Sequence, residues 1–307
     1  MSADTPALVL LSPAGVVADP AALRRAAQRL GRHGFAVQID ASAAARHQRF
    51  AGDDAIRLAA LHRVADAAPS VAMATRGGYG LTRLLDGIDW PLLLRSIERG
   101  TRWVGHSDMT ALQLSLLAHA GKGRRPVTWA GPMALDHFGR DEAAGGVDEV
   151  TEGCFLEAMR GELEAIGFRT ETGFEGLEVR GTLWGGNLTV LMSLLGTPHW
   201  PRIKGGILFL EDVNEHPYRI ERCLLQLHQA GVLEAQRAVV LGHFNHWKPS
   251  PLDRGYTLKT MVARVRSVCA TPILTGLPMG HVPCLVSLPI GARATLATQG
   301  REAFIGW

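Results

Sequence analysis

Three loops of this sequence each follow a hydrophobic run, and each carries a side chain that can take part in acyl transfer. The three side chains are Ser107, Glu211 and His281. A serine hydroxyl can attack a carbonyl carbon, a histidine can take and return its proton, and a carboxylate can orient the histidine and stabilise its charged form. Because functional groups of open α/β sheets collect beyond the carboxyl ends of the strands, these loops predict one site for nucleophilic acyl transfer.

The loop around Ser107 is the most informative of the three. Gly105 stands two positions before the serine, and a helical pattern begins at Met109. A tight turn there projects the hydroxyl while the N–H of Asp108 faces the same space, and a fixed oxyanion donor of this kind contributes ~3 kcal/mol. Because position 109 is methionine, the Gly-x-Ser-x-Gly motif of the α/β-hydrolases is absent. The alternative is that Ser107 or Asp108 only caps the helix.

Glu211 ends an apolar run, so we expect its carboxylate to be partly buried and to need a partner. A protonated histidine would satisfy it, and so would Arg219 or Arg222, which follow closely in the sequence. Asp212 and Glu215 are competing carboxylates that spacing alone does not exclude.

His281 lies in a loop rich in proline and glycine rather than on an apolar helical face, which weakens the alternative of a core histidine. As a general base it would take the proton of Ser107 and later pass it to the leaving amine, while Glu211 fixes its tautomer. Considered by itself, a loop histidine without a catalytic role remains the alternative.

Two further patterns have a weaker connection to chemistry. Residues 75–80 form a glycine-rich turn that lacks both the glycine order of a dinucleotide site and the lysine of a P-loop. Its amides would instead supply a second oxyanion donor or hold a carboxylate. His243 and His246 form an H-x-x-H pair with no third ligand nearby in the sequence. We therefore predict no metal and no cofactor.

Length, composition and charge limit the class of protein. The 307 residues are about twice a typical domain of ~150 residues, so two domains or one large domain are expected. A hydrophobic fraction of 47% and a charged fraction of 20% are those of a globular protein and exclude a disordered chain, a collagen or a coiled coil. The net charge is only +3 and the basic residues are scattered, so nucleic acid is not an expected partner.

The cysteines and the N-terminus predict a reduced, cytoplasmic protein. The N-terminal segment has no basic region and its apolar part is interrupted by Pro13, so no secretory signal is expected. The longer uncharged stretches contain Gly and Pro and do not predict a membrane span. Four well-separated cysteines without a C-x-x-C pair argue against a thiolate zinc site, a redox motif or a disulfide scaffold; they are Cys154, Cys223, Cys269 and Cys284.

Strands and helices alternate in the first half of the chain, which predicts an α/β fold with a mainly parallel sheet. Asp19 and Pro20 fit the start of a helix that Gly34 can close, and Asp53 can cap a second helix. The expected strands are 7–11, 35–39, 71–75 and 102–105, and the expected helices are 20–34, 53–68 and 109–120.

The sequence changes character between residues 141 and 175, where acidic, glycine-containing segments show little periodicity. We interpret this stretch as a linker between an N-terminal α/β domain, 1–140, and a second domain, 176–307. The second domain is expected to contain strands at 179–183, 206–210 and 238–241, β-like alternation at 284–288 and 293–297, and helices after Asn187 and over 217–230.

Five segments together resemble the bacterial serine LD-carboxypeptidases, the murein tetrapeptide carboxypeptidases of cell-wall recycling. They occur in the order of that family from near residue 74 to near residue 297 and cover most of the chain. The segments are ATRGGYGLTRLL, GHSDMTAL, GTLWGGNLTVLMSLLGTP, ILFLEDVNEHPYRIER and TGLPMGHVPCLVSLPIGARATL.

The resemblance implies an N-terminal parallel-sheet domain that carries the nucleophile and a C-terminal β-rich, barrel-like α+β domain that carries the rest of the triad. It implies catalytic roles for Ser107, Glu211 and His281, and it favours Glu211 over the neighbouring carboxylates. It also implies a homodimer. The implied oxyanion hole is formed by backbone N–H groups of Asp108, Gly77 and Gly78.

The implied reaction cleaves the bond between the L-centre of meso-diaminopimelate and the terminal D-Ala of a murein tetrapeptide, by way of an acyl-enzyme. A carboxypeptidase must recognise a free terminal carboxylate, and Arg76 or the amides beside it are our candidates for that role. The alternative for Arg76 is structural support of the glycine-rich turn. Tyr79 and Asn187 are further candidates for substrate contacts.

Two other functions compete with this one. The first is an immunity-type peptidase, similar to those that hydrolyse aminoacyl-nucleotide antibiotics such as microcin C, for which Trp184 or Trp247 would have to be available to stack on the base. The second is a non-catalytic module that binds muropeptides, although a binding protein has no need to keep Ser, Glu and His together.

Overall fold

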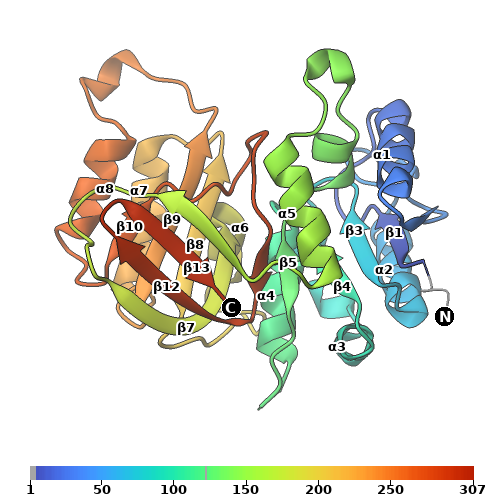
Figure 1. Ribbon diagram of the computed structural model, residues 1–307, viewed down its shortest axis with the longest axis horizontal. Coiled ribbons are helices and arrows are strands. Elements are labelled where there is room, and N and C mark those ends of the chain that lie inside the picture. The colour runs from blue at the N-terminus through green and yellow to red at the C-terminus, as the bar shows by residue number, and fades with distance from the viewer. Residues whose placement is uncertain (1–4, 122) are drawn as a thin grey trace.

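The structure of the protein is a computed structural model that describes residues 5–121 and 123–307. Two sheets lie side by side, the first built mainly from the N-terminal half of the chain and the second from the C-terminal half (Figure 1). Within the described residues, no helix combines the length and the apolar character needed to cross a membrane.

The first sheet has six strands in the order β11-β5-β4-β3-β1-β2. Strands β1 to β5 run parallel, and β11 joins the edge antiparallel to β5. The edge position tolerates Pro289 in β11, because an edge strand needs fewer N–H donors. The strands are β1 Ala7–Leu11, β2 Ala36–Ile39, β3 Val71–Ala74, β4 Arg102–Val104, β5 Thr128–Ala130 and β11 Leu288–Ile290.

Helices cover both faces of this sheet. Side chains from α2, α3 and α4 share one core with Val9 and Leu11, and side chains from α1 and α5 share another core with Leu8 and Leu10. This division follows from the alternation of side chains along a strand. The helices are α1 Pro20–Arg32, α2 Asp54–Ala67, α3 Trp90–Glu98, α4 Met109–His119 and α5 Glu149–Arg160.

The predicted helix starts in this half are confirmed. Asp19 accepts a hydrogen bond from Ala21 N at 2.8 Å with Pro20 in the first helical position, and Asp53 accepts one from Ile56 N at 2.8 Å. Both side chains satisfy backbone donors that have no acceptor within the helix.

The second sheet has seven strands in the order β10-β9-β8-β7-β12-β13-β6. Strands β7 to β10 are parallel, whereas β12, β13 and β6 pair antiparallel. The strands are β6 Ala165–Arg169, β7 Glu178–Asn187, β8 Ile207–Val213, β9 Ala238–Asn245, β10 Ile273–Thr275, β12 Arg293–Gln299 and β13 Glu302–Gly306, and the helices are α6 Leu188–Leu194, α7 Pro217–Gln229 and α8 Leu258–Arg266.

The second sheet curls so that its two edge strands approach each other at one end. Glu171, just after β6, accepts a hydrogen bond from the hydroxyl of Thr275 in β10. The strand ladder itself stays open between β6 and β10. The domain is therefore a mixed, curled sheet rather than a barrel closed by backbone pairing.

The stretch 141–175 contains more regular structure than a linker. Helix α5 buries Phe155 against the first sheet, and β6 pairs with β13 of the second sheet. The chain therefore crosses between the sheets within a few residues after Gly161, and it returns once when β11 joins the first sheet. The domain limits 1–140 and 176–307 remain predictions.

The β-like alternation at 284–288 is not a strand over that length, because the segment is irregular until β11 begins at Leu288. The sequence did not predict α3, β5, α5, β6, α8, β10 or β13.

A hydrogen bond from a backbone N–H to a side-chain hydroxyl joins the two halves in the first turn of α4. Asn187 N, at the end of β7, donates a hydrogen bond to Thr110 Oγ1 in α4 at 3.0 Å. Gly186 makes this approach possible, because a Cβ there would lie 2.4 Å from the same Thr110 oxygen and its φ of +136° disfavours other residues. This contact fixes the N-terminus of α4 against the end of the second sheet.

Candidate active site

A cavity of about 740 Å³ lies where the two sheets meet, and residues from both halves line it. The segments that follow β3, β4, β5, β8, β9 and β10 contribute to its lining. The lining residues are Arg76, Gly77, Gly78, His106, Ser107, Met133, Leu135, Asp136, His137, Arg140, Val213, Asn214, His246, His281, Val282 and Pro283.

Ser107 occupies a strained turn between β4 and α4. Its φ is +60°, in the left-handed region that residues other than glycine rarely adopt. Its Cβ and Oγ face Gly77, where an added Cβ would lie 2.7 Å from each. The turn thus presents the hydroxyl toward the glycine-rich turn after β3, and only a glycine at position 77 leaves room for it.

The capping alternative for this loop is wrong. Asp108 makes no side-chain hydrogen bond to the first turn of α4. Its carboxylate accepts a hydrogen bond from Leu81 N at 2.8 Å instead, and Ser107 makes no capping bond within the described residues. Burial raises the pKa of Asp108 to about 6, although the bond from Leu81 and the charge of Arg57 act in the opposite direction. Asp108 therefore ties the serine turn to the glycine-rich turn.

Glu211 and His281 are brought together across the second sheet. Oε2 of Glu211 lies 2.9 Å from Nδ1 of His281. Glu211 is only 1% exposed and its other oxygen, Oε1, has no hydrogen-bond partner within the described chain. An ionised carboxylate only accepts, so Nδ1 of the histidine carries the hydrogen and Nε2 is left as the basic nitrogen.

The carboxylates that compete with Glu211 for this role are engaged elsewhere. Glu215 pairs with Arg219 at 2.5 Å. Asp212 accepts hydrogen bonds from the Asn187 amide at 2.9 Å and from the Thr189 hydroxyl at 2.7 Å. Among the carboxylates that the sequence left open, Glu211 is the one that contacts His281.

The environment of His281 favours its protonated form. Burial alone would lower its pKa, but the hydrogen bond and the negative charge of Glu211 outweigh burial, with smaller contributions from Asp212 and Asp136, and the net pKa is raised above 6.5. The amide of Asn245 donates to the backbone oxygen of His281 at 2.7 Å and holds the loop in place. His281 is therefore oriented and electrostatically prepared to accept a proton.

The cavity is also lined by His106 and His137, two histidines for which the sequence predicted no role. His106 places its ring 5.1 Å from that of His281 and 5.5 Å from that of His137. Burial, together with the neighbouring His281, lowers the pKa of His106 to about 4, and burial together with His106 lowers the pKa of His137 to about 3. Both are neutral near pH 7, so His281 is the basic one of these three neighbouring histidines.

A short π-helical turn, Ala134–Phe138, brings His137 and Asp136 to the cavity. Burial raises the pKa of Asp136, while the positive charges of Arg76 and His281 oppose that rise. The sequence offered one signal for these residues, namely polar side chains within the apolar run after β5, and neither periodicity nor a motif distinguished them.

The predicted substrate residues separate into two groups. Arg76, Gly77 and Gly78 line the cavity, and Arg76 donates to Val16 O at 3.2 Å while its Nε is buried without a partner in the described chain. Tyr79 lies outside the cavity lining, 44% exposed, with its ring against Phe50.

Asn187 is also not a cavity residue. It is 4% exposed, its oxygen caps α6 by accepting from Val190 N at 3.1 Å, and its amide donates to Asp212. In place of the predicted substrate contacts, Asn187 has a capping role and Tyr79 packs on the surface. Each directly follows a pair of glycines, where sequence spacing does not determine the direction of a side chain.

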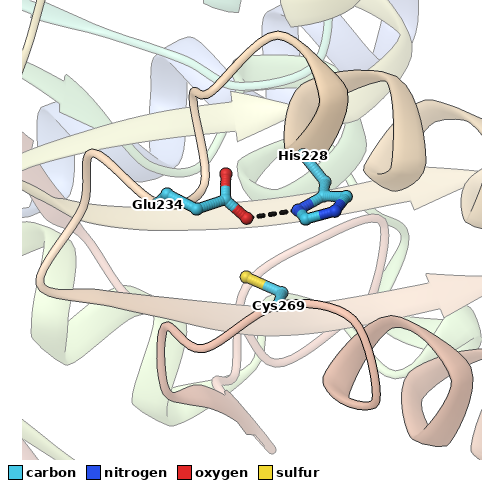
Figure 2. A group of neighbouring side chains, drawn as sticks. All are labelled: His228, Glu234 and Cys269. Atoms are coloured by element: carbon cyan, nitrogen blue, oxygen red, sulfur yellow. Dashed lines mark hydrogen bonds and ion pairs between the residues drawn. The ribbon is translucent and has the colours of Figure 1, made fainter.

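The H-x-x-H pair does not converge on one metal position. His246 lines the cavity beside Ser107, whereas His243 lines a second cavity between β9 and α8. His228, Glu234 and Cys269 form the one group of described residues with three potential ligand atoms close together, all within 4.8 Å of one another (Figure 2). His228 and Glu234 are hydrogen-bonded to each other, and none of the three lines the cavity with Ser107. This group has no contact with the candidate catalytic residues.

Comparisons with known proteins agree with this arrangement of two halves around one cavity. Residues 8–124 match the model of the LD-carboxypeptidase N-terminal domain, and residues 180–296 match that of the LD-carboxypeptidase C-terminal domain. The two matched segments together account for most of the chain.

Individual relatives extend over nearly the full length. The chain is 31% identical to the probable murein peptide carboxypeptidase of Bacillus subtilis, over 94% of this chain and 88% of that protein. It is 29% identical to the murein tetrapeptide carboxypeptidase of Pseudomonas aeruginosa, over 94% of this chain and 92% of the relative. The crystal structure of muramoyltetrapeptide carboxypeptidase from Oxalobacter formigenes is 38% identical and superposes with a TM-score of 0.87 over 97% of each chain.

Proposed function

The chain belongs to the LD-carboxypeptidase family, and on that premise we propose that it is a serine carboxypeptidase that releases the terminal D-Ala of a murein tetrapeptide. The bond cleaved is the one between meso-diaminopimelate and D-Ala. The observation that carries the proposal is the contact of Glu211 with His281 in the cavity that also contains the strained Ser107.

The proposed reaction uses these three side chains in sequence. Ser107 Oγ attacks the carbonyl carbon of diaminopimelate as His281 Nε2 takes its proton, and the C–N bond breaks when His281 gives that proton to the nitrogen of the departing D-Ala. A water molecule, deprotonated by His281, then attacks the ester and returns Ser107 to its hydroxyl form. Glu211 fixes the tautomer of His281 and stabilises its positive charge in both steps.

The oxyanion of each tetrahedral intermediate needs N–H donors beside Ser107. The N–H of Asp108 stands at the N-terminus of α4, where backbone donors have no helical acceptor. The turn at Gly77 and Gly78 faces the same cavity. These are the donors we propose. The hydrogen bond from Leu81 N to the Asp108 carboxylate holds the serine turn against the glycine-rich turn.

The cavity supports a carboxypeptidase better than a nucleotide-binding immunity peptidase. No Trp, Tyr or Phe is among the described residues that line it. Trp184 is fully buried, donates to Gln236 at 3.0 Å and packs against Trp200, and Trp247 packs edge-on against His216. Neither indole is available to stack on a base in this cavity.

A non-catalytic muropeptide-binding module is the less economical alternative. It would leave unexplained a buried carboxylate that orients a histidine beside a strained serine. A cytoplasmic location, a homodimer and independence from metal complete the proposal, and they rest on the sequence and the family resemblance.

The test is mass spectrometry of L-Ala-γ-D-Glu-meso-diaminopimelate-D-Ala incubated with the protein. We expect the wild type to release D-Ala with or without a chelator, and Ser107→Ala to release none. Ser193→Ala, at an exposed serine of α6, is the matched control and should behave as wild type. Inhibition by the chelator would contradict the serine mechanism, and retained tetrapeptide binding without D-Ala release by the wild type would favour the binding module.

A further inference from the structure

Two side chains of opposite charge line the cavity without a charged partner. Asp136 comes from the π-helical turn after β5, and Arg76 comes from the glycine-rich turn after β3. Among the described residues, neither one takes part in an ion pair. Arg140 also lines the cavity, but its Nη2 donates to Ala144 O at 2.7 Å. Asp136 is exposed in the cavity and Arg76 is half-buried, so both charges are accessible to a ligand that carries the opposite charges.

Arg76 has unused hydrogen-bonding capacity. Its Nη1 donates to Val16 O at 3.2 Å, which fixes the guanidinium, but its buried Nε has no partner in the described chain. A buried donor left without an acceptor is costly, so an unsatisfied one in a folded protein calls for a partner that the chain does not supply.

Asp136 is close enough to Arg76 and to His281 for their charges to act on its carboxyl, yet it forms no ion pair with either residue. Two further histidines of the cavity, His106 and His137, are buried and hydrogen-bonded to backbone groups. The negative charge of Asp136 is therefore not neutralised by a neighbouring contact and faces the cavity.

The positions of the two charges are coupled through the backbone. Leu135 N, next to Asp136, donates to the oxygen of Thr75, next to Arg76, at 2.8 Å. The π-helical turn adds a residue relative to an α-helical turn, and this geometry occurs frequently at functional sites. The separation of the two side chains is thus set by the fold rather than by flexible loops.

We propose that Asp136 binds the side-chain ammonium group of the residue before the cleaved bond, while Arg76 binds the carboxylate of the residue after it. This inference rests on the proposed function. A diaminopimelate side chain carries an ammonium group, and the terminal D-Ala carries the carboxylate. The cavity would then select peptides by a positive charge on one side of the scissile bond and a negative charge on the other.

The test compares two tetrapeptides of the form L-Ala-γ-D-Glu-X-D-Ala, in which X is L-Lys or Nε-acetyl-L-Lys, alongside the diaminopimelate peptide. The pair differs in the side-chain charge. For the wild type we expect kcat/KM to be about 10- to 100-fold higher for the lysine peptide than for the acetylated one, because a hydrogen bond to a charged group contributes about 1.5–3 kcal/mol.

Asp136→Asn should bring this ratio close to one by slowing cleavage of the charged peptide alone, and Asp136→Glu should retain the preference. Glu157→Gln removes an exposed carboxylate of α5 outside the cavity and should leave the ratio unchanged. If Asp136→Asn slows both peptides equally, Asp136 acts through His281 and the inference is overturned.

The outcome does not depend on one variant. If Asp136→Asn does not fold, equal cleavage of the two peptides by the wild type still overturns the inference, and a preference for the charged peptide that Asp136→Glu retains still supports it. Release of D-Ala from the diaminopimelate peptide without any preference between the other two would leave the proposed function intact and refute this inference. Absence of D-Ala release from all three peptides would instead refute the proposed function.

Discussion

The carboxylate of Glu211 accepts a hydrogen bond from Nδ1 of His281 across 2.9 Å, although the two residues are 70 positions apart in the chain. Glu211 lies near the end of β8, a parallel strand inside the second sheet, and His281 lies in the loop after β10. The bond leaves Nε2 as the basic nitrogen of His281, which lines the same cavity as Ser107. Several testable consequences depend on this relationship and on the turns that surround it.

Replacing Glu211 by Gln should abolish most of the activity without unfolding the protein. The amide can donate a hydrogen to Nδ1, which would place the remaining ring hydrogen on Nε2 and remove the base. We expect kcat to fall about 10³- to 10⁴-fold, a loss typical of an amide in place of an orienting carboxylate. Glu215→Gln is the control, since Glu215 pairs with Arg219. Retention of more than a tenth of the wild-type kcat by Glu211→Gln would contradict the assignment.

The acid limb of kcat/KM should lie above pH 6.5. Catalysis requires His281 in its neutral form. Burial lowers the pKa of His281, but the hydrogen bond and charge of Glu211 outweigh burial and raise that pKa above 6.5. Activity should therefore be lost as the pH falls through the raised pKa. In Glu211→Gln the main cause of the rise is gone, while burial and the weaker effects of Asp212 and Asp136 remain, so the residual activity should show its acid limb at lower pH. A pH profile of both proteins checks this, and an unchanged limb would argue against His281 as the base.

Gly77→Ala should inactivate the protein while leaving its fold in place. The added Cβ would lie 2.7 Å from both Cβ and Oγ of Ser107, so the serine must shift. A displacement of this size at a nucleophile costs about 10²-fold in rate. Gly31→Ala is a control for glycine replacement, because Gly31 lies in α1 without a positive φ and its added Cβ would meet no atom within 4 Å. Kinetics with circular dichroism measure both effects, and full activity of Gly77→Ala would show that the two turns are not rigidly apposed.

Buried His106 should make the protein sensitive to acid. Its pKa is about 4 in the folded state and 6.5 without the fold, so the unfolded chain binds the proton first and stability is lost as pH falls from about 6.5 to 4. The loss for one such residue reaches about 3 kcal/mol. His106→Asn keeps a donor for the oxygen of Gly131 and does not titrate, so its urea midpoint should change less over this pH range.

Asp108 acts in the opposite direction, because its raised pKa of about 6 favours the folded state as the carboxyl takes up a proton. That contribution is present in wild type and in His106→Asn alike. Buried His137 also has a lowered pKa, about 3, to which His106 contributes, so the difference between the urea midpoints measures His106 together with its effect on His137. Parallel pH dependence in the two proteins would show that His106 is not the acid-sensitive group.

Asn187→Ala should lower stability and leave substrate binding unchanged. The substitution removes the cap of α6 and a hydrogen bond to Asp212, and loss of an N-cap alone costs about 1 kcal/mol. Thermal unfolding should show a lower Tm, while KM for the tetrapeptide should match that of the wild type. A raised KM at unchanged stability would return Asn187 to the group of substrate contacts.

Much of the local structure was contained in the sequence. The first-half strands and helices could be predicted because hydrophobic runs, caps such as Asp19-Pro20 and closing glycines are short-range signals. Ser107, Glu211 and His281 were selected for a similar reason, since each follows a hydrophobic run and carries a reactive group. The family resemblance then gave them one order and one expected role.

Other features required contacts between distant segments. The sequence predicted a linker where α5 and β6 form. The stretch is mostly acidic and polar, so its few apolar residues, such as Phe155, which packs against the first sheet, gave no clear periodic pattern. It also left β11 in the second domain, although this strand pairs with β5 of the first sheet. Strand partners are chosen by burial over the whole molecule, which a single segment does not encode.

The sequence by itself therefore determined which reactive groups exist and that each ends or follows an element able to hold it. Only the tertiary structure decided that Glu211 rather than Asp212 contacts His281, that Tyr79 and Asn187 lie outside the cavity lining, and that Asp136 belongs to it. The physical reason is that direction and distance between side chains depend on how the two sheets pack, and that packing is a property of all the contacts together rather than of any local pattern.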